Sequence, residues 1–482
     1  MWGKSSHFAR IIFATYSILV TPNAWAKIDP CEAGVLLKPA IVLVDPFGFR
    51  AGEDLPKVAQ NLGFETIIVF SSKSLPPYLT QGAAANGTIS PITHEGMDSS
   101  TLIKIQQALS AHDAKAVAIL PGTESGVPLA DYISEQMGLP TNGSAQTVSR
   151  RDKYEMHETL FRAGVRSARL FKSSKNENEI EVEFKEWAKA NAPDFPDKAV
   201  IVKPAQSAGT DRVFTCRSFQ EVQEAWRAII GGTDTFGAVD KAAVAQRFLE
   251  GTEYIFDTIS TSVRDSAGKM QTYHLPVGAW RYHRRPPTIP GRAPIIDFVE
   301  WIPSEELPEG MKEYAFQVLN AVGIKFGAAH LEIMMTPDGP VLVEVGARLP
   351  GGLPALVNEA TLGMVNQPEL LIQAYAQPEK FLGTYRRFNG TYPSSHDAYI
   401  LFLSVEQTGE IIAPSKLKDI NVRNFPTLSD IRIFAKDGVA LQPTTDVTNA
   451  LLRAHFVGSP AEIERDVRQL RKLHSLRYFY KR

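Results

Sequence analysis

The sequence has little cysteine, no long apolar run outside its first residues, and no excess of either charge. Two cysteines, Cys31 and Cys216, are too few for a zinc cluster or a disulfide framework, and their separation excludes a CxxC redox motif. With 51 Lys and Arg against 53 Asp and Glu, no overall charge favours binding to nucleic acid or an anionic membrane. Beyond the N-terminus, no run of about 18 apolar residues predicts a membrane-spanning helix. The 482 residues suffice for roughly three globular domains.

The first 27 residues have the pattern of a secretory signal. An uncharged run follows Lys4 and Arg10 and ends in the small-residue pattern AWA at Ala26. The run is short for a bilayer span, and Pro22 would break its helix. The alternative interpretation is an N-terminal extension that is not removed.

Three short β-branched runs predict a parallel sheet in the first part of the chain. They are AIVLVD, TIIVF and AVAIL, at residues 40–45, 66–70 and 116–120. A Gly- or Pro-containing turn and a segment of helical period follow each run, as in a Rossmann-like domain. Residues 45–52 lack the GxGxxG spacing, so we expect no dinucleotide site there.

From about residue 198 the apolar runs follow one another with fewer helices between them. This pattern favours an antiparallel or mixed sheet. The clearest hairpin joins GAAHLEIMM to PVLVEVGAR through the turn TPDG at residues 336–339. An apolar helix is expected at about 354–376, and the last hundred residues predict a small α+β unit that ends in a charged helix from about 460.

Glu332 and Glu344 carry the strongest chemical signal in that hairpin. Each lies six residues from Asp338, so a turn centred there places the two carboxylates opposite one another on one face. Their β-carbons would then be about 5 Å apart. A divalent cation would remove the repulsion, and Mg²⁺ is commonly held by carboxylates together with phosphate oxygens. Two solvated glutamates are the alternative, which the apolar character of both strands disfavours.

A lysine followed by a loop of small residues gives a second signal. Lys203 ends the run AVIV, and the loop at 205–210 contains Ser207 and Gly209. Backbone N–H groups of such a loop can close over anionic oxygens while the lysine supplies charge. Lysines at strand ends and glycine turns also occur without any ligand, so this signal alone leaves both interpretations open.

The segment AQRFLEGTEY, residues 245–254, gives a third signal. Extended backbone at Phe248 and Leu249 can offer N–H and C=O groups to the edge of a flat heterocycle. The nearby carboxylate of Glu253 can accept hydrogen bonds from ribose hydroxyls. Without context the segment is a strand, a turn and a second strand.

Taken in this order, the motifs resemble the ATP-grasp superfamily. They are RDKYEM with Lys153, IVKP with Lys203, the SAGT loop, QRFLEGTEY, HLEI and VEVGARLPGG. The resemblance covers about residues 40–480 and is greatest to the L-amino-acid ligase and carnosine-synthase branch. It implies a mixed α/β and α+β architecture. The implied parts are a signal-like segment at 1–27, a Rossmann-like pre-ATP-grasp domain at 28–145, an ATP-grasp domain at 146–376 with its lid at about 160–250, and a C-terminal α+β unit at 377–482.

Matched position by position, the resemblance implies a role for each motif residue. The ATP phosphates would contact Lys153, Lys203, Ser207 and Gly209. The adenine would contact Gln246, Phe248 and Leu249, with Lys203 nearby, and the ribose would contact Glu253. Mg²⁺, or alternatively Mn²⁺, would bind Glu332 and Glu344. Arg348 would stabilise an acyl phosphate and a tetrahedral intermediate, with Gly351 near the carboxylate substrate. Gly346 stands where many relatives carry Asn, which leaves the number of metal ions open. His330 and His274 are minor candidates for substrate contacts.

The resemblance implies an ATP-dependent carboxylate-amine ligase that forms an amide or dipeptide bond through an acyl phosphate and releases ADP and phosphate. Its partners would be a small carboxylate and a small amine, with amino acids as the expected class, and no nucleic acid; a homodimer stays open. One alternative is an ATP-grasp ligation with a different carboxylate or acceptor. The other is a nucleotide-binding module without turnover, which the presence of both carboxylates and Arg348 disfavours.

The signal-like segment conflicts with this chemistry, because a ligase that consumes ATP has no supply of it outside the cytoplasm. Thr15, Tyr16 and Ser17 also weaken the apolar core of the segment as a signal. We therefore predict a cytoplasmic enzyme. Export with cleavage after Ala26 is the alternative.

Overall fold

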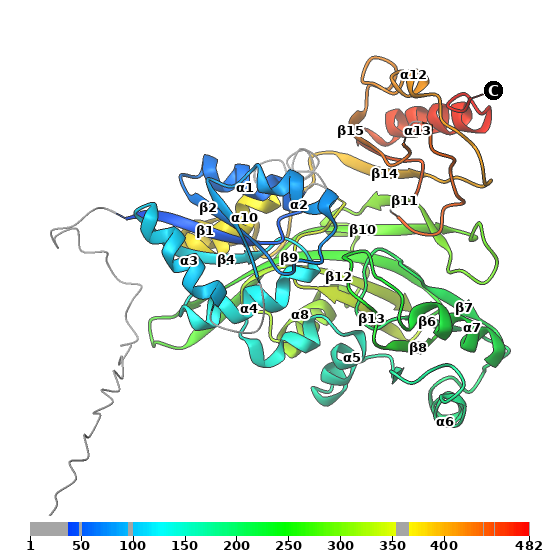
Figure 1. Cartoon of the computed structure of the whole chain (residues 1–482), viewed down its shortest axis with the longest axis horizontal. Coiled ribbons are helices and arrows are strands. Elements are labelled where there is room, and N and C mark those ends of the chain that lie inside the picture. The colour runs from blue at the N-terminus through cyan, green and yellow to red at the C-terminus, as the bar shows by residue number, and fades with distance from the viewer. Residues whose placement is uncertain are drawn as a thin grey trace, which may run out of the picture. The chain divides into compact units, whose positions relative to one another are not determined.

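Three β-sheets with their helices make up the part of the chain that the structure describes (Figure 1). The structure is a computed structural model, and it describes residues 37–47, 51–94, 100–352, 366–436, 438–447 and 449–481. Residues 38–482 group into one compact unit. The signal-like segment and Cys31 lie outside the described residues.

The first sheet has four parallel strands in the order β3-β2-β1-β4. Its elements are β1 (Lys38–Val44), α1 (Ala51–Asn61), β2 (Glu65–Phe70), α2 (Pro77–Ala84), β3 (Ile89–Thr93), α3 (Ser100–Ala111), β4 (Ala114–Pro121), the 3-10 helices at Glu124–Gly126 and Ser144–Arg150, and α4 (Val127–Gln136). The three predicted runs are β1, β2 and β4, so the parallel sheet is confirmed. The edge strand β3 was not predicted from its sequence ISPIT, because Pro91 interrupts the apolar pattern and suits only an edge position.

This strand order creates a topological switch point between β1 and β4. The chain moves from β1 to β2 and β3 on one side and then returns to β4 on the other. Ligands of open α/β sheets bind at the carboxyl ends of the strands beside such a point. Asp45 follows β1 there, and Gly122 follows β4. A β-carbon at Gly122 would lie 2.5 Å from the Asp45 carbonyl oxygen, so glycine lets the two strand ends approach.

The second sheet is antiparallel, with the order β5-β8-β6-β7. Its elements are α5 (Lys153–Arg162), β5 (Phe171–Ser173), α6 (Glu181–Asn191), β6 (Val200–Pro204), β7 (Phe214–Cys216), α7 (Phe219–Ile229) and β8 (Ala243–Arg247). Asp152 caps α5 by accepting hydrogen bonds from the backbone N–H groups of Tyr154 and Glu155, and this fixes Lys153 as the first helical residue. Cys216 is buried, and burial raises the pKa of its thiol to about 12, which agrees with a chemically silent cysteine.

The third sheet has eight antiparallel strands in the order β13-β12-β9-β10-β11-β14-β16-β15. Its elements are β9 (Thr252–Arg264), β10 (Met270–Arg285), β11 (Ile295–Trp301), a 3-10 helix at Ser304–Glu306, α8 (Met311–Ala321), β12 (Gly327–Thr336), β13 (Gly339–Gly346), α10 (Gln367–Ala376), α11 (Pro378–Phe388), β14 (Asp397–Leu403), α12 (Pro414–Leu417), β15 (Leu428–Ile433), β16 (Leu452–Gly458) and α13 (Pro460–Ser475). The predicted hairpin is β12 and β13. The C-terminal strands, predicted as part of a small unit, extend the same sheet because β14 pairs with β11.

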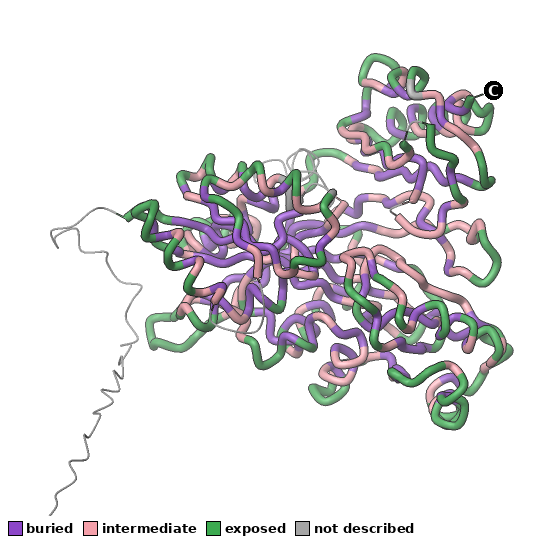
Figure 2. The backbone as a smooth tube through the Cα atoms, in the orientation of Figure 1, coloured by how far each residue is buried: buried purple, intermediate pink, exposed green. Residues whose placement is uncertain are grey.

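Large aromatic side chains pack against one another at the centre of this sheet. Trp280 on β10 and Trp301 on β11 are 2% and 3% exposed and meet edge to face, with ring centroids 5.0 Å apart. Figure 2 shows the buried strands against exposed helix surfaces and loops. Of the helix predicted at 354–376, the structure describes α10, and residues 353–365 lie outside the described part. Among the described residues, no helix is both long and apolar enough to cross a membrane.

Replacing Gly251 by Ala is expected to lower the free energy of unfolding by about 1–3 kcal/mol, because overpacking forces backbone shifts. Gly251 links β8 to β9, and a β-carbon there would lie 2.2 Å from the carbonyl oxygen of Met335 on β12. Urea unfolding measures the loss. The matched control is Gly383→Ala, since Gly383 lies in α11 and a β-carbon added there would meet nothing within 4 Å. Equal losses in the two variants would contradict this prediction.

Candidate active site

A cleft of about 1790 Å³ brings together the residues that the sequence singled out. The predicted site residues that line it are Lys153, Lys203, Ser207, Gly209, Gln246, Phe248, Leu249, Glu253, Glu332, Glu344, Arg348 and Gly351. They come from the start of α5, from the second and third sheets and from the segments that follow their strands. The cleft is large enough for a nucleotide together with a second small molecule.

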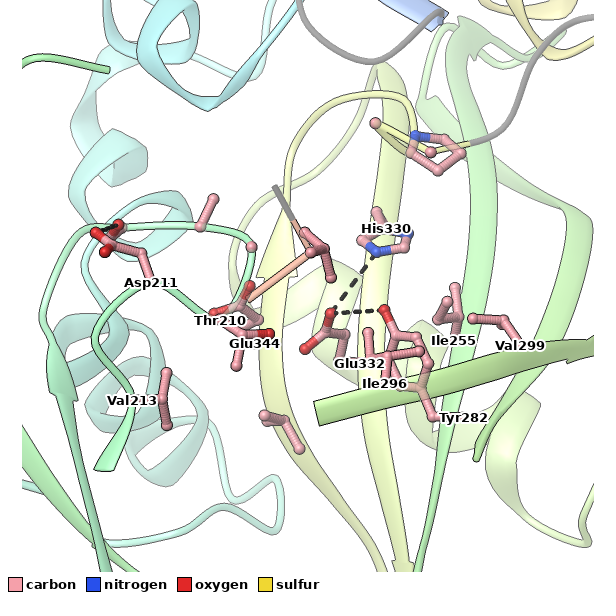
Figure 3. Close-up of a pocket in the computed structure, with 18 of the residues that line it drawn as sticks. Thr210, Asp211, Val213, Ile255, Tyr282, Ile296, Val299, His330, Glu332 and Glu344 are labelled. Atoms are coloured by element: carbon pink, nitrogen blue, oxygen red, sulfur yellow. Dashed lines mark hydrogen bonds and ion pairs between the residues drawn. The ribbon is translucent and has the colours of Figure 1, made fainter. Parts of the chain in front are cut away.

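Glu332 on β12 and Glu344 on β13 lie directly opposite one another, as the sequence predicts (Figure 3). The turn, however, is centred between Pro337 and Asp338, and not on Asp338. Side chains of directly opposed residues project from the same face of a sheet. The two carboxylates therefore share one face of the hairpin.

A β-bulge at Val343 is what aligns the two carboxylates. The hairpin pairs Thr336 with Gly339, a register that by itself would set Val343 opposite Glu332. The register shifts by one residue after Glu332, so Val343 is the extra residue and Glu344 becomes the partner. Bulges of this kind often aim side chains beside active sites.

The two carboxylates differ in charge state. Burial raises the pKa of Glu332 to about 7, and the negative charges of Glu344 and Glu253 add to this shift. Burial also acts to raise the pKa of Glu344, but the ammonium groups of Lys153 and Lys203 outweigh it and hold that pKa below its ordinary value. The lysines therefore favour the charged form of Glu344, whereas burial favours the protonated form of Glu332.

Two buried lysines lie beside this pair. The Nζ atom of Lys153 donates to the carbonyl oxygen of Ser207 at 2.7 Å and lies 3.0 Å from Oε2 of Glu344. Lys203 is 5% exposed at the end of β6. Burial, with a contribution from the charge of Lys153, lowers the pKa of Lys203 to about 8. An anion between the two ammonium groups would stabilise their charged forms.

The small-residue loop after β6 adopts an unusual backbone conformation. Gly209, Thr210 and Arg212 have φ angles of 72°, 66° and 47°. Non-glycine residues with positive φ are strained, and such strain is concentrated at ligand clamps and switch regions. The Ser207 hydroxyl donates to Oδ2 of Asp211 at 2.8 Å, which ties the two ends of the turn together.

The segment predicted to hold a heterocycle begins on β8 and continues beyond it. Because β8 ends at Arg247, Phe248 and Leu249 lie in the link after the strand. The N–H group of Phe248 donates to the carbonyl oxygen of Ala199 at 3.1 Å, so this N–H is already used within the protein. Gln246 is 4% exposed, and its Oε1 atom has no hydrogen-bond partner among the described residues. A buried acceptor of this kind fits the amino group of an adenine ring.

Glu253, the predicted ribose contact, is held in place by Arg284. The guanidinium of Arg284 on β10 donates to Oε2 of Glu253 at 2.7 Å and lies 5.0 Å from the ring centroid of Tyr282. Burial lowers the pKa of Arg284, but the charge of Glu253 more than offsets it, so the pKa lies above the ordinary value. The guanidinium of Arg284 therefore stays charged.

Arg348 forms an ion pair with Glu124, a residue that the sequence analysis did not single out. Burial acts to raise the pKa of Glu124, but Arg348, with a smaller effect from Arg151, holds it at about 2. A β-carbon at Gly346 would lie 2.8 Å from Oε1 of Glu124, so this carboxylate occupies the space that an Asn at position 346 would need. The position of Glu124, after the apolar run that forms β4, was the signal that could have identified it.

Of the two candidate histidines, one lies at the carboxylates. Nδ1 of His330 lies 2.7 Å from Oδ1 of the buried Asp257, and its Nε2 lies 3.9 Å from Oε1 of Glu332 (Figure 3). The hydroxyl of Tyr282 donates to the same Glu332 oxygen at 3.2 Å. His274 is buried and is not among the described residues that line the cleft.

Hard oxygen ligands are available for a divalent cation at the hairpin. Within the described ranges, no group of three or more His, Cys, Asp or Glu side chains is placed to hold a metal ion. Mg²⁺ usually binds through one or two carboxylates and keeps water or phosphate oxygens as its other ligands. Glu332 and Glu344 fit that mode.

Solved structures share the fold of this chain. The L-amino acid ligase from Bacillus licheniformis is 15% identical with a TM-score of 0.63, over 90% of this chain and 97% of that one. Carboxyaminoimidazole ribonucleotide synthase from Aspergillus clavatus, solved with ATP, is 14% identical with a TM-score of 0.58, over 90% of this chain and 98% of that one. At these identities the likeness concerns the fold, which is that of an ATP-grasp enzyme.

A curated relative establishes the family. Dapdiamide A synthase from Enterobacter agglomerans is 30% identical over 377 residues, which are 76% of this chain and 80% of that protein. No protein-family model matches the chain. The chain belongs to the ATP-grasp superfamily and is a carbon-nitrogen ligase that uses ATP.

In the protein without a bound cation, Glu332→Gln is expected to reduce the loss of folding stability that the wild type shows between pH 5 and pH 8. Since the pKa of Glu332 is raised to about 7, the folded state binds this proton more tightly than the unfolded state, and stability falls as pH rises from about 4.5 to 7. Glutamine removes that loss, a relative gain of about 1–3 kcal/mol. Unfolding with a chelator present at both pH values measures it. The exposed Glu305→Gln is the control, and a wild-type pH dependence in Glu332→Gln would contradict the assignment.

Proposed function

We propose that this ligase joins a carboxylate to an amine through an acyl phosphate and releases ADP and phosphate. The observation that carries the proposal is the opposed pair Glu332 and Glu344, which lies in one cleft with two buried lysines and the Glu124–Arg348 ion pair. An attack of a carboxylate on a phosphate brings two anions together. Cations held in place before the reaction lower that barrier.

ATP is proposed to bind along the second sheet. Oε1 of Gln246 and the backbone at Leu249 would receive the adenine, and Glu253 the ribose, through the oxygen not taken by Arg284. The phosphates would lie at Lys153 and Lys203, under the strained loop at 205–213. The proposed lid, residues about 160–250, contains this loop, and its closure would exclude water from the acyl phosphate.

Glu332 and Glu344 are the proposed ligands of Mg²⁺, with Mn²⁺ as the alternative. A bound divalent ion supplies positive charge to the phosphate oxygens and orients them. The partly protonated state of Glu332 would be lost on binding. With Glu124 in the space beside Gly346, only two carboxylates from the hairpin are proposed as ligands.

Arg348 is the proposed stabiliser of the reacting centre, with Gly351 near the carboxylate substrate. The substrate carboxylate attacks the γ-phosphate, and an acyl phosphate forms as ADP leaves. The amine then attacks the acyl carbon, loses a proton and expels phosphate. In both steps negative charge develops on oxygen, which the guanidinium can bind in a planar, bidentate manner. Glu124 holds that guanidinium before the substrate arrives.

The similarity to an L-amino acid ligase supports amino acids as the substrate class. A different carboxylate or acceptor is the second candidate.

The proposed boundaries at residues 28, 146 and 377, a homodimer and a cytoplasmic location remain predictions. Cell fractionation followed by N-terminal sequencing tests the location, and a periplasmic product beginning at Lys27 would overturn it.

The function is tested by incubating the protein with ATP, Mg²⁺ and pairs of L-amino acids, with ADP and the amide product as readouts. Glu344→Gln keeps the shape of the proposed metal site but removes a charge, so ADP formation should fall by about two or more orders of magnitude. Circular dichroism checks that the variant is folded. Near-wild-type turnover in Glu344→Gln would exclude the metal assignment, and an absence of ADP in the wild type with every pair would contradict the amino-acid substrates.

Arg348→Lys is expected to lower kcat by about tenfold or more while the KM for ATP stays within a factor of two. Lysine keeps the charge but cannot reproduce the planar fork that matches a developing oxyanion. Steady-state kinetics at varied ATP separates the two constants. If the variant loses only affinity for ATP, Arg348 binds the nucleotide and does not stabilise the reacting centre.

A further inference from the structure

Helix α5 contacts three consecutive residues of β13, at positions 343–345. The contacting side chains, Lys153, Met156 and His157, are buried and spaced i, i+3 and i+4, so they lie on one face of the helix. The contacts join Lys153 to Glu344 at 3.0 Å, Met156 to Val345 at 3.3 Å and His157 to Val343 at 3.4 Å. The helix therefore contacts the strand at Glu344, a proposed metal ligand, and at the residue on either side of it.

The contact of His157 is with the extra residue of the β-bulge. An extra residue of this kind has no partner in the ladder, and its backbone groups need hydrogen bonds from elsewhere. The carbonyl oxygen of Val343 can only accept, so Nε2 of His157 carries the proton of this long hydrogen bond. His157 therefore offers a donor at the point where the pairing of β12 with β13 is interrupted.

The imidazole ring of His157 is neutral. Burial lowers its pKa to about 3, and the positive charge of Lys203 adds to this shift. A neutral imidazole has one N–H group, and its other nitrogen can only accept. Nδ1 is buried and has no hydrogen-bond partner among the described residues, which agrees with the single proton on Nε2. The ring thus has one polar contact in the described part of the chain, and that contact is with Val343.

The first turn of α5 is fixed to the loop after β6. The backbone N–H group of Lys153 donates to the carbonyl oxygen of Ala205 at 3.0 Å, and its Nζ atom donates to that of Ser207 at 2.7 Å. Asp152, which caps the helix, accepts a hydrogen bond from Nε2 of Gln206 at 3.3 Å. One helix therefore contacts both the loop proposed to hold the phosphates and the strand that carries Glu344.

We propose that His157 is a positioning residue, which holds the bulge at Val343 and so keeps Glu344 opposite its partner carboxylate. This inference rests on the proposed function, in which Glu332 and Glu344 bind the divalent cation. His157 itself is not among the described residues that line the cleft. Without its donor, the bulge carbonyl would turn toward another one. Because the same peptide bond joins Val343 to Glu344, that rotation would move the carboxylate.

The test compares His157→Leu with His157→Gln. Nε2 of glutamine can donate from about the place of the imidazole Nε2, whereas leucine fills similar space without a donor. The Kd for Mn²⁺ is measured by electron paramagnetic resonance with a non-hydrolysable ATP analogue bound. It should rise by about ten- to a hundredfold in His157→Leu and by less than about threefold in His157→Gln.

Crystal structures of both variants give a readout that requires neither a metal ion nor turnover. Glu344 should leave its place opposite Glu332 in His157→Leu and keep it in His157→Gln. If His157→Leu does not fold, His157→Asn takes its place, because the asparagine amide is too short to reach Val343. The same loss of alignment is then expected.

The matched control is His474→Leu. His474 on α13 contacts the hydroxyl of Tyr480 and is not among the described residues that line the cleft. This variant also removes a histidine hydrogen bond, but the Kd for Mn²⁺ should not change. Urea unfolding of all variants separates positioning from stability. A less stable His157→Leu with an unchanged Kd and an unmoved Glu344 would show a purely structural role and overturn the inference.

The outcomes also separate this inference from the function on which it rests. If Glu344→Gln binds Mn²⁺ as the wild type does, the metal assignment fails, and the crystal structures alone then decide the role of His157. An unmoved Glu344 in a variant without the donor would overturn that role. Equal displacement of Glu344 in His157→Gln and His157→Leu would overturn it too, since the donor would then not be what holds the bulge.

Discussion

The repulsion between two carboxylates held opposite one another across β12 and β13 is the constraint around which the cleft is organised. Three of the cations nearby do not depend on a ligand for their positions, because each forms an ion pair with a carboxylate. These ion pairs are Lys153 with Glu344, Arg348 with Glu124, and Arg284 with Glu253. Such preorganisation lowers the cost of reorganising charge during a reaction. Burial, together with the negative charges of Glu344 and Glu253, still raises the pKa of Glu332 to about 7.

Local sequence patterns predicted most of the fold, since buried runs and turn residues are determined locally. β1, β2, β4 and the hairpin of β12 and β13 could all be identified in this way. The partner of β14 could not, because the pairing of a strand with β11, about a hundred residues earlier, leaves no local mark in either sequence. The edge strand β3 was missed for a local reason: its proline interrupts the apolar pattern, so its pairing with β2 is needed to recognise it as a strand.

The site was predictable where the chemistry lay within one motif. Glu332 and Glu344 were identified because a short hairpin relates them, although the bulge at Val343 that aligns them has no signature in the sequence. Glu124 was missed because its partner, Arg348, lies more than two hundred residues away. The N–H of Phe248 shows a further limit: a free backbone donor cannot be assumed until its neighbouring strand is known.

The continuity of the eight-stranded sheet has a consequence for how this protein can change. Because β14 pairs with β11, cutting the chain before residue 397 would leave β11 with an open edge, to which another chain could pair. The C-terminal residues therefore cannot be gained or lost as an independent module. Exchange of this segment between homologous enzymes, in evolution or in engineering, would have to preserve the ladder between β11 and β14, while the exposed side chains of α13 could vary behind it.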